Sequence, residues 1–150
     1  MKKWSGAAGI CINEKGELLM VLQGKPEEEK RWTIPSGGIE KGETFEECCV
    51  RELWEETGYH VQVTEKINVK QGYQKEYGLS VEVHYFSVRL TGGEKVIQDP
   101  DGLIYAIDWK NIEGINNLIL SFPEDREFLI NFIQNSQMMQ EENVHKQKLK

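Results

Sequence analysis

The chain has 150 residues, of which 39% are hydrophobic and 29% are charged, and its formal net charge is −7. This length and composition fit one globular domain that spans residues 1–150. No apolar run approaches the roughly 20 residues needed to cross a bilayer. The negative charge argues against long nucleic acids as partners, because their binding depends on basic side chains that release counterions.

The N-terminus and the cysteines indicate the compartment. Residues 1–6 lack the apolar segment of a secretory signal. The chain has three cysteines, an odd number, and Cys48 and Cys49 are adjacent. This usage fits reduced thiols in a core rather than a disulfide framework. We therefore expect a cytoplasmic protein.

The first elements predicted along the chain are strands. Residues 7–12 and 18–22 are short apolar runs separated by a polar turn at 13–17, and this pattern predicts a β-hairpin. After a polar loop at 24–31, residues 32–34 are expected to form a short strand that stops at the proline which follows.

A glycine-rich loop at residues 36–43 leads into a predicted helix at 44–57. Thr44 and Glu47 have the spacing of a capping box, which satisfies free N–H groups of the first turn. Gly58 is placed to end the helix in a left-handed conformation. The apolar face expected on this helix consists of Cys49, Val50, Leu53 and Trp54.

Strands are predicted again after the central helix. Residues 61–69, about 72–77 and 81–90 have the composition of strands, with a turn at 91–94 and a further strand at 103–109. Strands before and after one central helix indicate the α+β class.

A last helix is expected to open near residue 121. Ser121 can cap it, and Pro123 suits its first turn. Its predicted apolar face is Phe128, Leu129, Phe132 and Ile133. The polar tail from about Gln137 is expected to fray.

The central helix carries a group of acidic residues. Glu52, Glu55 and Glu56 are three and four residues apart, so they share one side of the helix. Like charges held together repel, and a hard divalent cation such as Mg²⁺, with Mn²⁺ as a substitute, relieves that repulsion because it prefers carboxylate oxygens. Arg51 is placed to pair with Glu43 or with a glutamate of the helix. The alternative is an ordinary solvated face, which is the commoner role of such a helix.

The longer spacing decides between these two interpretations. Gly37 is followed after five residues by Glu43, and after a further seven by residues 51–59, Arg-Glu-Leu-Trp-Glu-Glu-Thr-Gly-Tyr. This segment resembles the Nudix box of the Nudix hydrolase family, whose members include MutT-like proteins, at every defining position. A small departure is Ser36, where many members carry another glycine.

The resemblance implies an α/β/α sandwich with a mixed β-sheet. It also implies metal-dependent hydrolysis of a diphosphate linkage in a nucleoside triphosphate or a nucleoside diphosphate derivative. By the same resemblance, Glu55 and Glu56 bind the metal, Glu52 binds it or helps to deprotonate the attacking water, and Arg51 orients Glu52. The main-chain candidates for a further metal ligand are the carbonyls of Ser36 and Gly37.

Members of the family often use one more acid outside the box. The candidates here are Glu82 in a strand and Asp99 or Asp101 in the loop of residues 98–102. Loops held by a rigid scaffold favour catalytic side chains. The sequence Asp-Pro-Asp-Gly is equally good turn chemistry, so the alternative stays open.

Substrate-binding residues are the least specific part of the pattern. Arg31, with Lys25, is a candidate for phosphate contact, and Trp32 and Tyr77 are candidates for stacking on a base. Each of these is more commonly an ordinary core or surface residue. The other aromatic candidates are Tyr73, Tyr85 and Phe86.

Three functions compete at this point. The first is a Nudix pyrophosphohydrolase that acts on a small nucleotide. The second is a Nudix-fold module that binds or senses a nucleotide without cleaving it, and the third is removal of pyrophosphate from RNA 5′ ends. All box glutamates are present, which favours an enzyme. The sequence leaves the substrate and a homodimer open.

Overall fold

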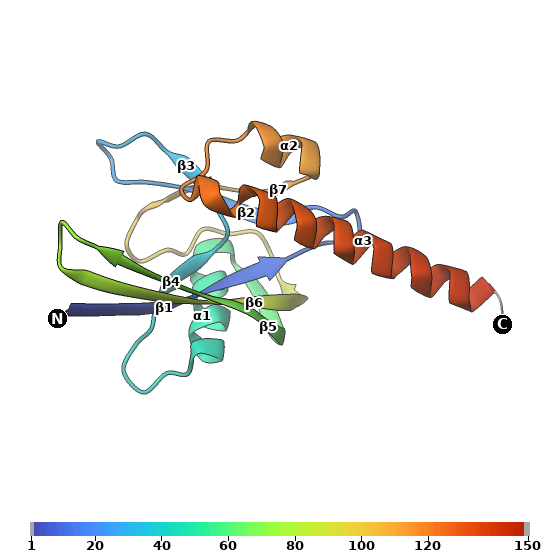
Figure 1. The fold of residues 1–150 in the computed structure, drawn as a ribbon, viewed down its shortest axis with the longest axis horizontal. Coiled ribbons are helices and arrows are strands. Elements are labelled where there is room, and N and C mark those ends of the chain that lie inside the picture. The colour runs from blue at the N-terminus through green and yellow to red at the C-terminus, as the bar shows by residue number, and fades with distance from the viewer. Residues whose placement is uncertain (1, 149–150) are drawn as a thin grey trace.

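A computed structural model describes the backbone of residues 2–148 and the side chains of residues 2–139. Figure 1 shows strands in the middle of the molecule with helices on both sides. The elements are β1 (Lys2–Cys11), β2 (Leu18–Gln23), β3 (Arg31–Thr33), β4 (Ser36–Gly38), α1 (Phe45–Thr57), β5 (Tyr59–Gln74), β6 (Leu79–Gly93), β7 (Ile104–Lys110), α2 (Ile112–Asn117), the 3₁₀ turn η1 (Pro123–Asp125) and α3 (Arg126–Lys148).

The strands form two sheets. The larger sheet has the order β4-β1-β6-β5 and the smaller one has the order β3-β2-β7. The larger sheet is mixed, because β1 runs parallel to β6 and antiparallel to β4. The expected mixed sheet is therefore confirmed.

The predicted hairpin of residues 7–12 and 18–22 is wrong. The two segments are strands, but they meet only at an isolated bridge between Ile12 and Leu18. β1 is buried along Ala7–Cys11, and it lies in the middle of the larger sheet between β4 and β6. Because both faces of β1 are buried, it is an internal strand. Its two neighbours, β4 and β6, come from later parts of the chain.

The hydrophobic core lies on both sides of the sheets. Leu53 and Cys49 of α1 pack on one side against Phe86, while Leu129 and Ile133 of α3 pack on the other. Figure 1 shows α1 on one side of the strands and α2 and α3 on the other. This arrangement confirms the expected α/β/α layers.

The central helix forms as predicted at both ends. The side chain of Thr44 accepts a hydrogen bond from the backbone N–H of Glu47 at 3.0 Å, and the Glu47 carboxylate accepts from the N–H of Thr44 at 2.9 Å. Gly58 ends the helix with a φ of 81°. Trp54 was expected on the apolar face but is 39% exposed. Its ring stacks on His60 instead of packing in the core.

The strands after α1 are longer than predicted. Residues 61–69 and 72–77 do not form separate strands, because residues 59–74 make one strand, β5, whose pairing with β6 shifts at three irregularities. The turn expected at 91–94 is also wrong. β6 continues to Gly93, which pairs with Tyr59 at the start of β5.

The C-terminal region begins differently from the prediction. Ser121 does not cap a helix, because its backbone N–H donates to the carbonyl of Trp32 at 2.9 Å and holds this segment along β3. The turn η1 follows without a side-chain cap, and α3 then continues past Gln137, where we expected fraying, to Lys148. The short helix α2 was not predicted. Among the described residues, no helix has the length and apolar character to span a membrane.

Candidate functional site

The loop and the helix of the box meet where β4 faces α1. An added Cβ atom at Gly37 would lie 2.1 Å from the carboxyl carbon of Glu52. A residue with a side chain at this position would displace that carboxylate. The glycine therefore lets the backbone of β4 approach the acidic side of α1.

Arg51 holds the acidic side chains of this region in place. Its guanidinium donates to both oxygens of Glu43, at 2.7 and 2.9 Å, and to Glu52 at 2.8 Å. It also donates to Glu55 at 3.2 Å and to the carbonyl of Gly38 at 2.9 Å. The hydrogen bonds from Arg51 lower the pKa of Glu43. The expected pairing of Arg51 with Glu43 and with helix glutamates is confirmed.

Glu56 is the most buried acid of the group, with 4% of its surface exposed. Its carboxylate accepts a long hydrogen bond, 3.4 Å, from the backbone N–H of Ser36. Burial, followed by the hydrogen bond and charge of Glu52, raises the pKa of Glu56 well above its usual value. Burial also raises the pKa of Glu52. Two carboxyl groups in contact, away from water, make a place that favours a bound cation.

The β1–β4 pairing distinguishes the two main-chain candidates for a metal ligand, the carbonyls of Ser36 and Gly37. The N–H of Gly9 donates to the carbonyl of Pro35, and the N–H of Ile39 donates to the carbonyl of Ser5. Because hydrogen-bonded pairs alternate along antiparallel strands, Gly37, which faces Ala7 between these pairs, turns its carbonyl toward β1. Ser36 instead points its backbone away from β1, as its N–H bond to Glu56 shows.

The donor atoms gathered here fit a hard divalent cation, since they are carboxylate oxygens and a free carbonyl. In the described part of the chain, no three His, Cys, Asp or Glu side chains converge with metal-binding geometry. Glu52 and Glu55 are held by Arg51, and Glu56 is turned toward Ser36. Side-chain rotation of Glu52 and Glu55 is therefore needed to bring all three carboxylates onto one ion.

A hollow of about 490 Å³ lies beside the carboxylates. Ser36 lines it, and the same residue bonds to Glu56. Its walls come from β1, β5, β6 and the segment that precedes α3, and they combine apolar and aromatic surface with two acids and a lysine. The side chains that matter below are Trp4, Lys70, Tyr73, Tyr85, Phe122, Glu124 and Asp125.

These features have the arrangement of a known domain. Residues 2–132 match the model of the NUDIX domain. The chain belongs to the NUDIX domain family. Nudix hydrolases generally use divalent metal ions, in keeping with the carboxylates of α1.

Relatives and solved structures extend this family assignment. A Caenorhabditis elegans protein, provisionally named nudix hydrolase 1, is 33% identical over 112 residues, which are 73% of this chain and 29% of that protein. A Bacillus subtilis (strain 168) protein, provisionally named an 8-oxo-dGTP diphosphatase, is 38% identical over 89 residues, or 59% and 55% of the two chains. The chain thus spans less than two thirds of these relatives. A NUDIX hydrolase from Nitrosomonas europaea shares the fold, with a TM-score of 0.75 and 19% identity over 91% of this chain and 90% of that one.

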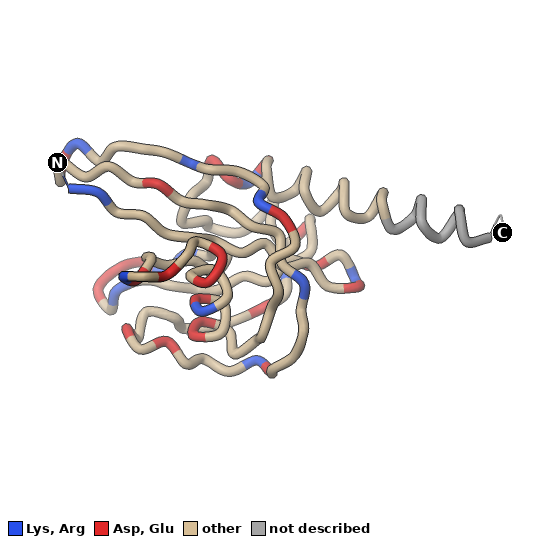
Figure 2. Tube along the Cα trace, turned by 90° about the horizontal axis from the view of Figure 1, so that it is seen from below, with Lys and Arg blue, Asp and Glu red and all other residues tan. Residues whose placement is uncertain are grey.

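The Nudix box is surrounded by negative charge. Figure 2 shows acidic positions, in red, around the central helix and the loops beside it. Arg51 is the cation inside this group, and its side chain is only 21% exposed. A polyphosphate therefore needs a cation at the carboxylates to overcome repulsion at this edge.

The three candidates for an additional acid lie in different places. The segment before Asp99 runs along the end of α1, where the N–H of Gln98 donates to the carbonyl of Glu55 at 2.9 Å. The charge of Asp99 contributes to the raised pKa of Glu56, so Asp99 lies near the box. Its carboxylate also accepts from the N–H groups of Leu103 and Ile104, which is turn chemistry.

Among the described residues, no contact joins the other two acids to the glutamates of α1. Asp101 is exposed in the turn after Asp99, and its N–H donates to the Asp99 carboxylate at 3.1 Å. Glu82 lies on β6, where it bonds to His84 at 2.9 Å and to Gln71 at 3.1 Å.

Of the aromatic candidates for substrate binding, Tyr73 and Tyr85 line the hollow near Ser36, whereas the other three are not among its lining residues. Trp32 packs against the core and carries the ammonium of Lys110 over its ring at 4.2 Å. Tyr77 is 70% exposed, at the tip of the β5–β6 hairpin. Phe86 is buried in the core.

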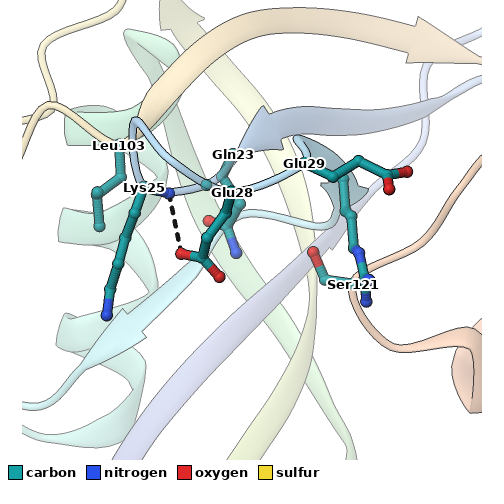
Figure 3. A pocket seen from close by; sticks show the side chains of 8 residues that line it. Gln23, Lys25, Glu28, Glu29, Leu103 and Ser121 are labelled. Carbon is teal, nitrogen blue, oxygen red and sulfur yellow. Dashed lines mark hydrogen bonds between the residues drawn. The ribbon is translucent and has the colours of Figure 1, made fainter.

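Arg31 and Lys25 line a second, open hollow of about 540 Å³. Figure 3 shows that Glu28 and Glu29 lie in the same hollow, with Glu28 accepting from the backbone N–H of Lys25 at 3.2 Å. This surface is of mixed charge and gives no focused site for phosphate.

Several lining residues of the hollow near Ser36 were missed by the sequence prediction. Trp4 was considered only within residues 1–6, which lack a secretory signal, and the residues from 121 onward were considered as the start of a helix. The available signal was Phe122, an apolar residue two positions before the consecutive acids Glu124 and Asp125. Lys70 gave no signal, because its partners are more than 50 residues away in the chain.

The buried charge of Glu56 leads to a prediction about stability without metal. Its pKa is raised in the folded protein, so the folded state holds its proton more tightly, and stability falls as the pH rises from about 4.3 toward the folded pKa. We expect Glu56→Gln to raise the melting temperature in EDTA at pH 8 by at least about 2–4 °C, the effect of 1 kcal/mol in a chain of this size. The gain should vanish near pH 4. Thermal unfolding at both pH values measures it, and a lower melting temperature at pH 8 would contradict it.

Proposed function

We propose that this protein is a metal-dependent pyrophosphohydrolase that cleaves a diphosphate linkage in a nucleoside triphosphate or a nucleoside diphosphate derivative. The observation that carries the proposal is the position of Ser36. Its backbone contacts the buried carboxylate of Glu56, and the same residue lines the 490 Å³ hollow. A nucleotide with its base in the hollow therefore has its phosphates at the acidic side of α1.

Mg²⁺ is the cation that we assign to this site, with Mn²⁺ as a substitute. Glu55, Glu56 and the carbonyl of Ser36 would hold it, since all three present hard oxygen atoms. When bound, the cation supplies charge neutralisation for the diphosphate and makes the attacking water more acidic.

In this proposal Glu52 accepts a proton from the attacking water, and Arg51 orients Glu52. Arg51 donates to Oε1 of Glu52 at 2.8 Å and fixes that carboxylate against the backbone of Gly37. Glu52 is then placed beside the cation ligands to accept a proton from the water that attacks phosphorus. Arg51 holds Glu52 and Glu55 next to the proposed cation position, and rotation of the Glu55 side chain then brings its carboxylate onto the ion.

The base occupies the hollow beside Ser36. The aromatic rings of Trp4, Tyr73 and Phe122 line it, and each is between 38% and 59% exposed. Partly exposed rings at a hollow suit stacking on a planar base. The name of the Bacillus subtilis relative, an 8-oxo-dGTP diphosphatase, supports testing an oxidised purine among the substrates. The three described cysteines are free and buried, as in a reducing compartment, so we place the activity in the cytoplasm.

Hydrolysis of a nucleotide panel tests the proposed function. The panel contains the common nucleoside triphosphates, 8-oxo-dGTP, ADP-ribose and an RNA with a 5′ triphosphate, each with Mg²⁺, with Mn²⁺ and with EDTA. We expect release of pyrophosphate or phosphate from a small nucleotide with either metal, and none with EDTA. Binding without turnover of any compound would instead indicate a nucleotide-sensing module.

A further inference from the structure

Lys70 lies among the acids that line the hollow beside Ser36. Its ammonium is 2.8 Å from an oxygen of Glu124 and 3.1 Å from Oδ1 of Asp125. It also lies 4.9 Å from the ring centre of Phe122. The hydroxyl of Tyr85 donates to the other oxygen of Asp125 at 3.0 Å. One ammonium therefore stands between two carboxylates that belong to a distant turn of the chain.

Lys70, Glu124 and Asp125 can form further hydrogen bonds. An ammonium has three N–H donors, and Lys70 uses two of them on Glu124 and Asp125. The second oxygen of Glu124 has no hydrogen bond from the described residues. Among the described residues, each carboxylate oxygen of Asp125 has a single partner, which leaves it a further lone pair. The group therefore presents one free donor beside free acceptors.

The pKa values of Lys70 and Glu124 both shift in favour of their charged forms. The two carboxylates outweigh the effect of burial and raise the pKa of Lys70. The hydrogen bond from Lys70 lowers the pKa of Glu124. Lys70 is therefore a donor only, and Glu124 an acceptor only, at neutral pH.

Space for a ring exists beside Lys70. Gly72 pairs with Val81 on β6, and Val81 pairs with Trp4 on β1, so these three residues form a row across the sheet that lines the hollow. A Cβ atom at Gly72 would have nothing within 4 Å. A planar base placed over Gly72 would direct its edge toward Lys70, two residues away on β5, and toward the carboxylates.

Guanine and adenine present opposite patterns at this edge. Guanine carries the O6 acceptor and, beside it, the N1–H and N2–H donors, whereas adenine carries an amino donor at C6 and an acceptor at N1. The free N–H of Lys70 matches O6, and the carboxylates match the N1–H and N2–H groups. Adenine would set its amino group against the ammonium and its N1 against a carboxylate.

We propose that Lys70 is a specificity-determining residue that selects a 6-oxopurine, such as guanine or its oxidised form, over a 6-aminopurine. The proposal rests on the function proposed above, because it assumes that a nucleotide base enters the hollow. Truncation of one partner of a charge-assisted hydrogen bond costs about ten- to a hundredfold in affinity. The preference for guanine over adenine should fall by a similar factor when the ammonium is removed.

The variant Lys70→Met tests this inference, because methionine keeps an apolar stem of similar length and lacks the donor. We expect the ratio of kcat/KM for dGTP to that for dATP to fall about tenfold or more, with Lys70→Arg retaining most of the ratio. Lys66→Met is the matched control, since Lys66 is an exposed lysine of the same strand and should leave the ratio unchanged. An unaltered ratio in an active Lys70→Met protein would overturn the inference while the hydrolase function stands.

Binding measurements separate the two proposals. Titration calorimetry with GMP and with AMP, on the wild type and on Lys70→Met, reports base selection without turnover. Selective binding of GMP that is lost in Lys70→Met would support the role of Lys70 even if no nucleotide were hydrolysed, in which case only the hydrolase function would fail. Equal binding of GMP and AMP by the wild type would overturn the inference.

Discussion

Glu56→Gln is expected to lower the turnover of the preferred nucleotide by about a thousandfold while the protein remains folded. A bound divalent cation contributes several kcal/mol of transition-state stabilisation, and each 1.36 kcal/mol is a factor of ten in rate. Glutamine keeps the size and the carbonyl oxygen of the side chain, but it lacks the charge that binds the cation. The measurement is steady-state hydrolysis at saturating Mg²⁺, with circular dichroism as the check of folding.

Glu46→Gln provides the control for this variant. Glu46 lies on the same helix but is exposed in its first turn, away from the acids that Arg51 contacts. It should keep wild-type turnover. Because Glu56→Gln is also expected to stabilise the metal-free protein, loss of activity would occur together with a gain in stability, which general unfolding cannot produce. Retained activity in Glu56→Gln would remove Glu56 from the metal site.

Arg51→Met is expected to lower both stability and turnover. The variant leaves Glu43, Glu52 and Glu55 without their shared cation, and these carboxylates then repel one another. Loss of one partner from a buried ion pair costs about 3–5 kcal/mol. Because the Arg51 side chain is 21% exposed, we expect a cost of about 2–3 kcal/mol, below that range. Denaturant unfolding in EDTA measures it.

Two further variants give the Arg51 prediction its specificity. Arg51→Lys keeps the charge but cannot reach Glu43, Glu52 and Gly38 together, since one ammonium lacks the planar fork of a guanidinium. It should recover part of the stability and little of the turnover. Arg89→Met removes an exposed arginine of β6 and should change neither. Full turnover in Arg51→Lys would mean that Arg51 supplies charge alone rather than geometry.

The sequence was sufficient for the parts of the protein that depend on local spacing. The capping box of Thr44 and Glu47 and the left-handed Gly58 define α1, because each acts within one turn of the helix. The clustering of Glu52, Glu55 and Glu56 follows from the helical period. The family, the layers and the reaction class could be predicted because the Nudix box concentrates these features in one segment.

Sequence spacing failed where partners are distant in the chain. The pattern of residues 7–12 and 18–22 is compatible with a hairpin, but β1 pairs with β6 instead, 77 residues further along the chain. Ser121 was predicted to cap a helix, but its backbone N–H donates to the carbonyl of Trp32 and holds the segment along β3. Only the assembled sheets show which alternative buries more apolar surface.

The two parts of the candidate site therefore differ in origin. The sequence by itself determined the acidic helix, its arginine and the glycine loop, because residues a few positions apart on a helix or a turn have fixed relative positions. The tertiary structure alone decided that the carbonyl of Gly37 faces β1 while that of Ser36 faces away from it, and that Trp4, Lys70 and Asp125 line one hollow. Those positions depend on strand register and on packing between distant segments, which local propensity does not encode.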